Sequence, residues 1–354
     1  MAKKILPYLA AFFTAALLLP FACPSVKGAQ VDFETSSQAL YMVDLNTQEV
    51  VYQKNATQRM APASCTKIMT YIVAAEAIAD LENTKITAGS NVATLLQGTD
   101  SSLSGIRQGE ELTALQLLNC MMSPSGNDAA LVLAEYVGQG SVSTFVEKMN
   151  EKARELGCRN TRFSNPHGLH NEGHYTTAQD LYTMTKYAMA LPYFMEIVTQ
   201  TEYTLPPTNL YAGARTVYTT NKMMDKNETV YYESYIRGIK TGYHDQAGYC
   251  LVTTAQKQEE RYLIVALGAP IEAVHGEMLD TKNLYDWAFG GFGNSSPVLA
   301  QNVYPAVKRE QMWEKLNGIV SSPWFLVICS MVVMIAVLVL SDNVRTHRRR
   351  KQRK

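Results

Sequence analysis

The sequence predicts an α+β fold in which helices cover an antiparallel sheet. Strand-like segments open the body of the chain, helical segments fill its middle, and strand-like segments return before one last helix. That order is typical of α+β domains, whereas alternating strands and helices would indicate a parallel sheet. Apolar residues make up 47% of the 354 residues and charged residues 18%, which supplies a large core and excludes wholesale disorder.

The first half of the body begins with a predicted β-hairpin. Two apolar runs within residues 38–54 are separated by Asn46-Thr47, a pair typical of turns. Residues 65–81 are rich in alanine and apolar at helical spacing, which predicts a long buried helix starting near Pro62–Ser64. Four more helices are predicted over residues 112–122, 127–137, 142–156 and 177–190, with a break at 123–126.

The second half of the body returns to strands. The pattern predicts strands near residues 216–220 and, most strongly, over 235–241, 248–255 and 262–267. The first of these strong strands ends in Lys240-Thr241-Gly242. Residues 272–289 predict the last helix.

The first 28 residues predict a secretory signal peptide. Lys3 and Lys4 form a basic start, residues 5–22 are an apolar run, and small residues precede a cleavage site before Ala29. We therefore expect the body of the chain to be exported.

The C-terminal residues predict a membrane anchor. Residues 323–340 carry no charge, and as an α-helix they reach about 27 Å, enough to span a bilayer core. Seven basic residues lie within the last ten positions, a pattern typical of a cytoplasmic tail beside a membrane span. We therefore predict an exported domain at 29–294, a linker at 295–322, a transmembrane helix at 323–341 and a basic cytoplasmic tail at 342–354.

The charge distribution indicates that nucleic acid is not a partner. The chain has 32 basic and 32 acidic residues, but ten of the basic residues lie in the two terminal segments. Without these segments, 22 basic and 31 acidic residues remain, a net charge of −9. A phosphate backbone would repel so acidic a body.

The cysteines and histidines do not indicate a metal site. The cysteines of the body are Cys65, Cys120, Cys158 and Cys250. They have no short-range zinc or disulfide spacing, and their apolar neighbours predict buried free thiols. His167, His170 and His174 fall in a loop with Gly, Asn and Pro, where we expect them to satisfy backbone groups.

A Ser-x-x-Lys pair at the start of the predicted buried helix is the first candidate for chemistry. Residues three apart share a helix face, so the Lys67 amine can reach the Ser64 hydroxyl. An inward-facing lysine on an apolar helix is desolvated and loses its proton more readily. A neutral amine beside a hydroxyl can act as the base of a nucleophile, and the helix N-terminus favours developing negative charge.

Two further short motifs mean little alone. Ser125-Gly126-Asn127 lies in the break between two predicted helices, where Ser125 or Asn127 could simply be a helix N-cap. Lys240-Thr241-Gly242 could be an ordinary strand end. Each of the three motifs occurs once, however, and 61 and 115 residues separate them, so only a fold can bring them together.

In this order the motifs resemble those of a known family, the penicillin-binding serine D-alanyl-D-alanine carboxypeptidases of low molecular mass. Residues 61–70 (APASCTKIMT) and 124–130 (PSGNDAA) resemble two of its segments. The loop 165–178, with NPHGL and HYTTA, and the segment 238–249, with GIKTG and AGY, resemble two more. The resemblance covers about residues 37–292 and implies a domain similar to those of β-lactamases and transpeptidases.

The resemblance implies a reaction with an acyl-enzyme. Ser64 would attack the carbonyl of the penultimate D-Ala of a peptidoglycan stem pentapeptide, and the terminal D-Ala would leave. Lys67 would be the base, and Ser125 would relay a proton to the leaving amine. Water would then release the shortened peptide, without a metal or another cofactor, and β-lactams would trap Ser64.

The resemblance also implies how the substrate is bound. The substrate-binding residues would be Asn127, Lys240, Thr241, Gly242 and Tyr243. Asn127 would hold the substrate backbone, while Lys240 and Thr241 would bind the terminal carboxylate. Lys240 would also keep Lys67 neutral through like-charge repulsion. The backbone N–H groups of Ser64 and Tyr243 would form an oxyanion hole.

The implied setting is cell-wall biogenesis and cell shape in a bacterium. The protein would be a single-pass protein of the cell membrane, held by its C-terminal helix, with its catalytic domain outside the cytoplasm. Two departures from the family pattern stand out. About thirty residues before the span leave no room for the second, β-rich domain of many relatives. The loop 270–276 lacks the Arg that helps many relatives hold the substrate carboxylate.

Other functions stay open at this point. A serine β-lactamase shares the first and third motifs, but it usually has Ser-Asp-Asn as the second and needs a deacylating base, for which only Glu172 is near. A penicillin sensor would need an intracellular output domain. An inactive scaffold and transpeptidation, which uses the same acyl-enzyme, are further alternatives.

Overall fold

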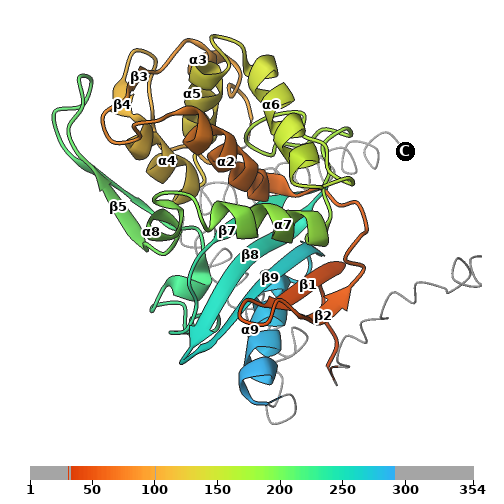
Figure 1. Cartoon of the computed structure of the whole chain (residues 1–354). Coiled ribbons are helices and arrows are strands. Elements are labelled where there is room, and N and C mark those ends of the chain that lie inside the picture. The colour runs from red at the N-terminus through yellow and green to blue at the C-terminus, as the bar shows by residue number, and fades with distance from the viewer. Residues whose placement is uncertain (1–30, 32, 100, 292–354) are drawn as a thin grey trace, which may run out of the picture.

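The computed structural model describes residues 31, 33–99 and 101–291 (Figure 1). The predicted signal peptide, linker, transmembrane helix and tail lie outside these residues. In the part of the chain that is described, no helix is long and apolar enough to cross a membrane.

A five-stranded antiparallel sheet forms the centre of the molecule (Figure 1). Its strands are β1 (Ala39–Asp44), β2 (Val50–Lys54), β7 (Lys240–His244), β8 (Gly248–Lys257) and β9 (Glu260–Ala269). They lie in the order β2-β1-β9-β8-β7, so the opening hairpin pairs with the strands that end the body. The predicted antiparallel sheet is confirmed, and β7 lies at its edge.

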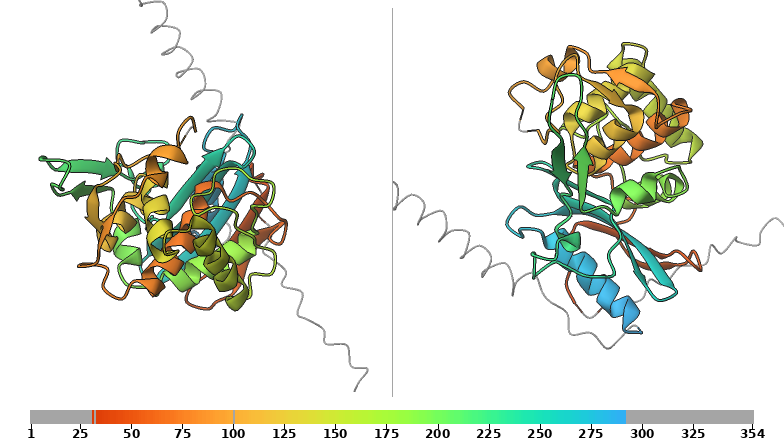
Figure 2. Two further views of the ribbon diagram at one scale, coloured as in Figure 1. Left: turned by 90° about the horizontal axis from the view of Figure 1, so that it is seen from above. Right: turned by 90° about the vertical axis from the view of Figure 1, so that its left-hand side faces the viewer.

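Both faces of the sheet are covered because its central strands are apolar at successive positions. In β1, Tyr41 and Val43 belong to the core shared with most helices, whereas Leu40 and Met42 belong to the core shared with α9 (Gly276–Phe289). Successive side chains of a strand point to opposite faces, so one strand contributes to both cores. Figure 2 shows α9 and the other helices on opposite sides of the sheet.

A layer of helices covers one face of the sheet (Figure 1). Its elements are α2 (Lys67–Ala77), α3 (Asn91–Thr94), α4 (Ala114–Met122), α5 (Asn127–Val137), α6 (Val142–Glu155), α7 (Ala178–Ala188) and α8 (Phe194–Val198). In α2 the first eight residues are all buried, because α4, α5, α6 and α7 pack around it. The predicted helices over 112–122, 127–137, 142–156 and 177–190 are confirmed within a few residues at each end.

Short elements complete the fold. Two small antiparallel pairs are β3 (Lys85–Thr87) with β4 (Glu111–Thr113), and β5 (Glu202–Leu205) with β6 (Arg215–Tyr218). Two 3₁₀ turns are η2 (Ala63–Thr66) and η3 (Lys222–Met224). The β5–β6 hairpin leads through residues 219–221 to the edge of the central sheet.

Three predicted boundaries are wrong. The long helix predicted over 65–81 is the turn η2 followed by α2, which ends at Ala77 because Ile78 takes an extended conformation. The helix predicted over 272–289 begins only at Gly276. The strand predicted over 235–241 begins at Lys240, so the Lys-Thr-Gly motif opens β7 instead of ending a strand.

The reason for the late start of β7 lies at Gly238. Residues 237 and 239 already donate backbone hydrogen bonds to Thr254 O and Val252 O of β8, at 2.8 and 3.0 Å. Gly238 itself has φ +77, and a Cβ there would lie 2.7 Å from Val198 O. The chain therefore follows β8 without forming a regular strand until Lys240.

Candidate active site

Ser64 lies in the turn η2, directly before α2, and this turn is held from two sides. Ala63 has φ +46, a conformation that side chains rarely adopt. On one side Gly168, with φ +92, packs so closely that a Cβ there would lie 1.9 Å from Ala63 O. On the other side a Cβ at Gly242 would lie 3.0 Å from Ser64 N. Two glycines thus allow the loop 165–169 and the edge strand β7 to fix the Ser64 backbone.

His174 supports the same turn. Its Nδ1 accepts a hydrogen bond from Ser164 N at 3.1 Å, so the ring proton lies on Nε2 and is donated to Thr66 Oγ1 at 2.8 Å. Thr66 Oγ1 in turn donates to Ala63 O at 2.8 Å. Burial lowers the pKa of His174 to about 4, which keeps the ring neutral.

The prediction of buried free thiols is confirmed, and the prediction that loop histidines satisfy backbone groups is confirmed for two of the three histidines. His174 and His167 both accept from backbone N–H groups, of Ser164 and Leu169 respectively. The four cysteines of the body are buried free thiols. Among the described residues there is no group of three or more side chains arranged to hold a metal ion.

Lys67 contacts the Ser64 hydroxyl as its spacing predicts. Its Nζ lies 3.0 Å from Ser64 Oγ, 2.6 Å from Asn127 Oδ1 and 2.9 Å from His167 O. The side chain is fully buried, and burial, followed by the charge of Lys240, lowers the pKa of Lys67 well below its usual value. A neutral amine has two N–H bonds and one lone pair. The amide and carbonyl oxygens accept the two N–H bonds, which leaves the lone pair for the Ser64 proton.

Asp128 is an acidic neighbour that the sequence did not single out. Its charge raises the pKa of Lys67, but burial and Lys240 together have the larger effect. Its carboxylate accepts hydrogen bonds from the backbone N–H groups of Ser104, Ile106 and Ala129, at 2.9 to 3.0 Å. Asp128 thereby ties the loop 101–106, which forms part of the cleft wall, to the start of α5.

Ser125 presents a hydroxyl with no partner. It has φ +64, is only 4% exposed, and its Oγ makes no hydrogen bond within the described part of the chain. The N-cap of α5 is Gly126, and no side chain caps this helix. The alternative in which Ser125 or Asn127 serves as the cap is therefore wrong, and both side chains are available for other work.

Asn127 uses both ends of its amide inside the protein. Its Oδ1 accepts from Lys67, and its Nδ2 donates to Ser101 Oγ at 3.0 Å. The side chain is 3% exposed and lies behind the cleft wall. In this structure Asn127 orients Lys67, and direct contact with a substrate stays a prediction.

The Lys-Thr-Gly motif forms the other wall. Lys240 is 1% exposed, donates to Thr241 O at 3.0 Å, and burial lowers its pKa to about 8. Thr241 Oγ1 forms a hydrogen bond with Thr220 Oγ1. Tyr243 is 45% exposed, and its ring lies against Tyr249 with centroids 4.6 Å apart.

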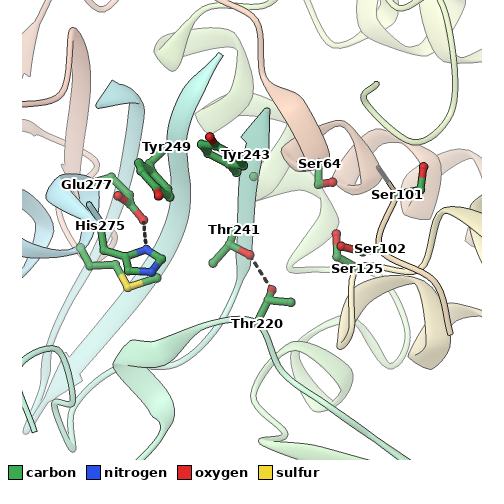
Figure 3. A pocket seen from close by; sticks show the side chains of 12 residues that line it. Ser64, Ser101, Ser102, Ser125, Thr220, Thr241, Tyr243, Tyr249, His275 and Glu277 are labelled. Atoms are coloured by element: carbon green, nitrogen blue, oxygen red, sulfur yellow. Dashed lines mark hydrogen bonds and ion pairs between the residues drawn. The ribbon is translucent and has the colours of Figure 1, made fainter. Parts of the chain in front are cut away.

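These walls enclose a cleft of about 370 Å³ (Figure 3). It is lined by Ser64, Ser101, Ser102, Ser125, Thr220, Thr241, Gly242, Tyr243, Tyr249, His275, Glu277 and Met278. Five of the eight predicted site residues line it, and the other three, Lys67, Asn127 and Lys240, lie behind its walls. The remaining lining residues come from loops (Ser101, Ser102, Thr220 and His275), from β8 (Tyr249) and from the first turn of α9 (Glu277 and Met278). Sequence reasoning assigned none of them a role in the site.

A serine–lysine pair beneath the edge strand of an antiparallel sheet is typical of the active-site-serine enzymes that include penicillin-binding proteins and class A β-lactamases. A family model described as D-alanyl-D-alanine carboxypeptidase matches residues 25–271. The chain belongs to this family, a family of peptidases, which confirms the family predicted from the motifs.

Individual relatives agree. The chain is 34% identical over 310 residues to D-alanyl-D-alanine carboxypeptidase DacF of Bacillus subtilis, covering 85% of this chain and 73% of that one. It is 29% identical to DacA of Escherichia coli, covering 75% of this chain and 64% of that one. Its fold matches the crystal structure of the Streptomyces K15 DD-transpeptidase with a TM-score of 0.66 at 27% identity, covering 74% of this chain and 100% of that one.

Proposed function

We propose that this protein removes the terminal D-alanine from peptidoglycan stem pentapeptides through an acyl-enzyme on Ser64. The observation that carries the proposal is the fully buried Lys67 amine, 3.0 Å from Ser64 Oγ at the floor of a cleft. Its lowered pKa supports an amine that is ready to accept a proton.

In the first half of the reaction, Ser64 Oγ attacks the carbonyl carbon of the penultimate D-Ala while Lys67 accepts the hydroxyl proton. The oxyanion forms against the backbone N–H groups of Ser64 and Tyr243. The carbon–nitrogen bond then breaks, and Ser125, whose hydroxyl has no partner in the described structure, relays the proton to the leaving amine. The products are free D-Ala and an ester on Ser64.

In the second half, water attacks the ester carbonyl and Lys67 accepts a proton from that water. The carbon–oxygen bond to Ser64 breaks, and the proton returns to Ser64 Oγ. The shortened peptide leaves with a new carboxylate, and no metal or cofactor takes part. A β-lactam would acylate Ser64 in the same way, and its product would stay on the serine.

Contacts along β7 support substrate binding at this strand. Gly242 lets the backbone of β7 approach Ser64, and the Thr241 hydroxyl faces the cleft. Lys240 is buried behind the cleft wall, and it carries a positive charge there when its amine is protonated. We assign recognition of the substrate's C-terminal end to this strand, with Asn127 holding Lys67 in place.

The setting we propose is the outer face of a bacterial cell membrane. The sequence supports it through the signal-like segment 1–28 and the uncharged segment 323–340 followed by a basic tail. The domain 29–294 would act on peptidoglycan from an anchor at 323–341. Protease protection of the tail in inside-out and right-side-out vesicles tests this topology.

The test of the reaction uses the full-length protein in detergent and a diacyl tripeptide that ends in D-Ala-D-Ala. We expect release of D-Ala, loss of release after penicillin treatment, and an adduct on Ser64 by mass spectrometry. Ser64→Ala should lose release and adduct together, whereas Ser102→Ala, a serine of the same cleft, should still form the adduct. A penicillin adduct without D-Ala release would indicate a scaffold, and fast penicillin hydrolysis would indicate a β-lactamase.

Transfer to an amine is a second candidate, favoured by the structural similarity to the Streptomyces K15 DD-transpeptidase. The same acyl-enzyme would then react with an amino group in place of water. Adding a free D-amino acid or glycine to the assay separates the two, because a transpeptidase forms the exchanged peptide at the expense of the hydrolysed one.

A further inference from the structure

A histidine–glutamate pair lies at the end of the cleft away from Ser64, beyond Thr241 (Figure 3). His275 Nδ1 is 3.5 Å from Glu277 Oε1. His275 precedes α9 with φ +54, and Glu277 lies in the first turn of that helix. The family comparison and the reaction assign no role to either residue.

The imidazole of His275 is held in a defined orientation. Its ring contacts Tyr249 of β8 and Tyr231, with centroids 5.0 and 5.5 Å apart. Nδ1 is buried on the side of Glu277, so the exposed edge of the ring, with Nε2, faces the cleft (Figure 3).

One oxygen of the buried Glu277 carboxyl group has no hydrogen-bond partner. Its side chain is 1% exposed, and its Oε2 forms no hydrogen bond within the described residues. Burial raises the pKa of Glu277 above its usual value. A buried polar atom without a partner is costly, and a bound ligand or water is one explanation for such an atom beside a cleft.

The charge of the cleft wall then decides what this pair can bind. The substrate proposed above ends in a carboxylate. Of the twelve residues that line the cleft, His275 is the only one whose side chain can be positive. Lys67 and Lys240 are fully buried behind the wall and already donate to oxygens of the protein.

We propose that His275 binds the C-terminal carboxylate of the substrate, together with the Thr241 hydroxyl, and that Glu277 is the positioning residue that holds the ring. The inference rests on the proposed function and specifies how its substrate is recognised. It also accounts for the loop 270–276, which contains no Arg.

The proton balance of the pair favours this assignment. With one shared proton, either Glu277 donates to Nδ1 of a neutral ring whose proton is on Nε2, or the ring is an imidazolium beside a carboxylate. In both arrangements Nε2–H can donate to the substrate. Without that proton the pair carries a negative charge and Nε2 is only an acceptor, so it repels a carboxylate. The groups that face the ring are Glu277, Tyr231 and Tyr249.

The test compares the tripeptide as a free acid with its C-terminal carboxamide, in the full-length protein. His275→Asn should lower kcat/KM for the free acid by about 10- to 100-fold, the range of one lost hydrogen bond to a charged group, and leave the carboxamide nearly unchanged. Asn suits the left-handed backbone at this position. His275→Arg should keep the preference for the free acid, and His170→Asn, at an exposed histidine, is the matched control.

Glu277→Gln tests the positioning role through the pH profile. We expect the ratio of kcat/KM for the free acid to kcat/KM for the carboxamide to fall as pH rises. In Glu277→Gln this fall should occur at lower pH than in the unchanged protein, and acidifying the medium should restore the ratio. If Glu277→Gln instead lowered kcat/KM for both substrates equally at every pH, the loss would be structural, and the role of Glu277 would be overturned.

Equal losses for both substrates, or no loss, in His275→Asn would overturn the role of His275. Acylation of Ser64 by benzylpenicillin and by its methyl ester gives the same comparison without D-Ala release. If the protein released no D-Ala, the proposed function would be refuted. The two penicillin acylation rates would still show whether the site prefers a carboxylate.

Discussion

The close packing of Gly168 against the turn that carries Ser64 gives a sharp prediction, the effect of Gly168→Ala. Gly168 has φ +92, and its new Cβ would lie 1.9 Å from Ala63 O and 3.0 Å from Ser64 N. The left-handed conformation alone costs about 1–2 kcal/mol for a residue with a side chain. Overpacking adds about 1–3 kcal/mol, so we expect about 2–5 kcal/mol off the free energy of unfolding.

The same change should also slow acylation. To restore a normal contact, the loop 165–169 and the turn that carries Ser64 must separate by about 1 Å or more. Such a misplacement of a reacting group costs on the order of 100-fold in rate. We therefore expect Gly168→Ala to slow acylation of Ser64 by a fluorescent penicillin by about that factor.

Gly173→Ala is the matched control in the same loop. Its φ is ordinary, and a Cβ there would first meet Asn171 Oδ1 at 3.2 Å, with no atom of the turn η2 among its three nearest neighbours. Urea unfolding and stopped-flow acylation, measured side by side, give both quantities. If Gly168→Ala matched the Gly173→Ala control in stability and in acylation rate, the argument from close packing would be refuted.

Four other predictions follow from buried charges and the free hydroxyl. Acylation should slow as pH falls, because protonation of Lys67 removes the base. Lys240→Gln should move this acid limb to higher pH, since the charge of Lys240 lowers the pKa of Lys67, and a pH series of acylation rates shows the shift. Arg215→Ala should destabilise the fold by about 3 kcal/mol in urea unfolding, because it leaves the fully buried carboxylate of Glu110 without its cation. Ser125→Ala should keep the fold and lower D-Ala release by about 100-fold or more, since proton relay contributes that much, and an unchanged release rate would remove Ser125 from the mechanism.

Local chemistry made part of the site predictable. The three-residue spacing of Ser64 and Lys67 and the apolar pattern of α2 place the amine beside the hydroxyl whatever else the fold does. The two apolar runs within residues 38–54 likewise predict a β-hairpin, and β1 and β2 pair as one. These features depend on residues that are close in sequence, and they were predicted correctly.

The remainder depends on contacts between distant segments. The start of β7 was misplaced because the left-handed conformation of Gly238, packed against Val198, leaves no periodic signal. The lining residues Thr220 and His275 come from irregular segments that the sheet edge and α9 bring to the cleft. A serine or histidine in a loop has the same appearance in the sequence whether it faces solvent or a substrate.

The positions of Lys67 and Lys240 also give a reason for the second buried lysine, although Lys67 alone would supply a base. A single buried lysine loses its proton through desolvation alone, but Asp128 works against that loss. Lys240 offsets Asp128, and it remains a positive charge behind the strand that is proposed to receive an anionic substrate. Among the described residues that line the cleft, only His275 can be a cation, so a carboxylate bound as proposed above would lie at the end of the cleft away from Ser64 and Lys67. In that arrangement the scissile carbonyl lies at Ser64, and the substrate's own charge does not add to the effect of Asp128 on the base.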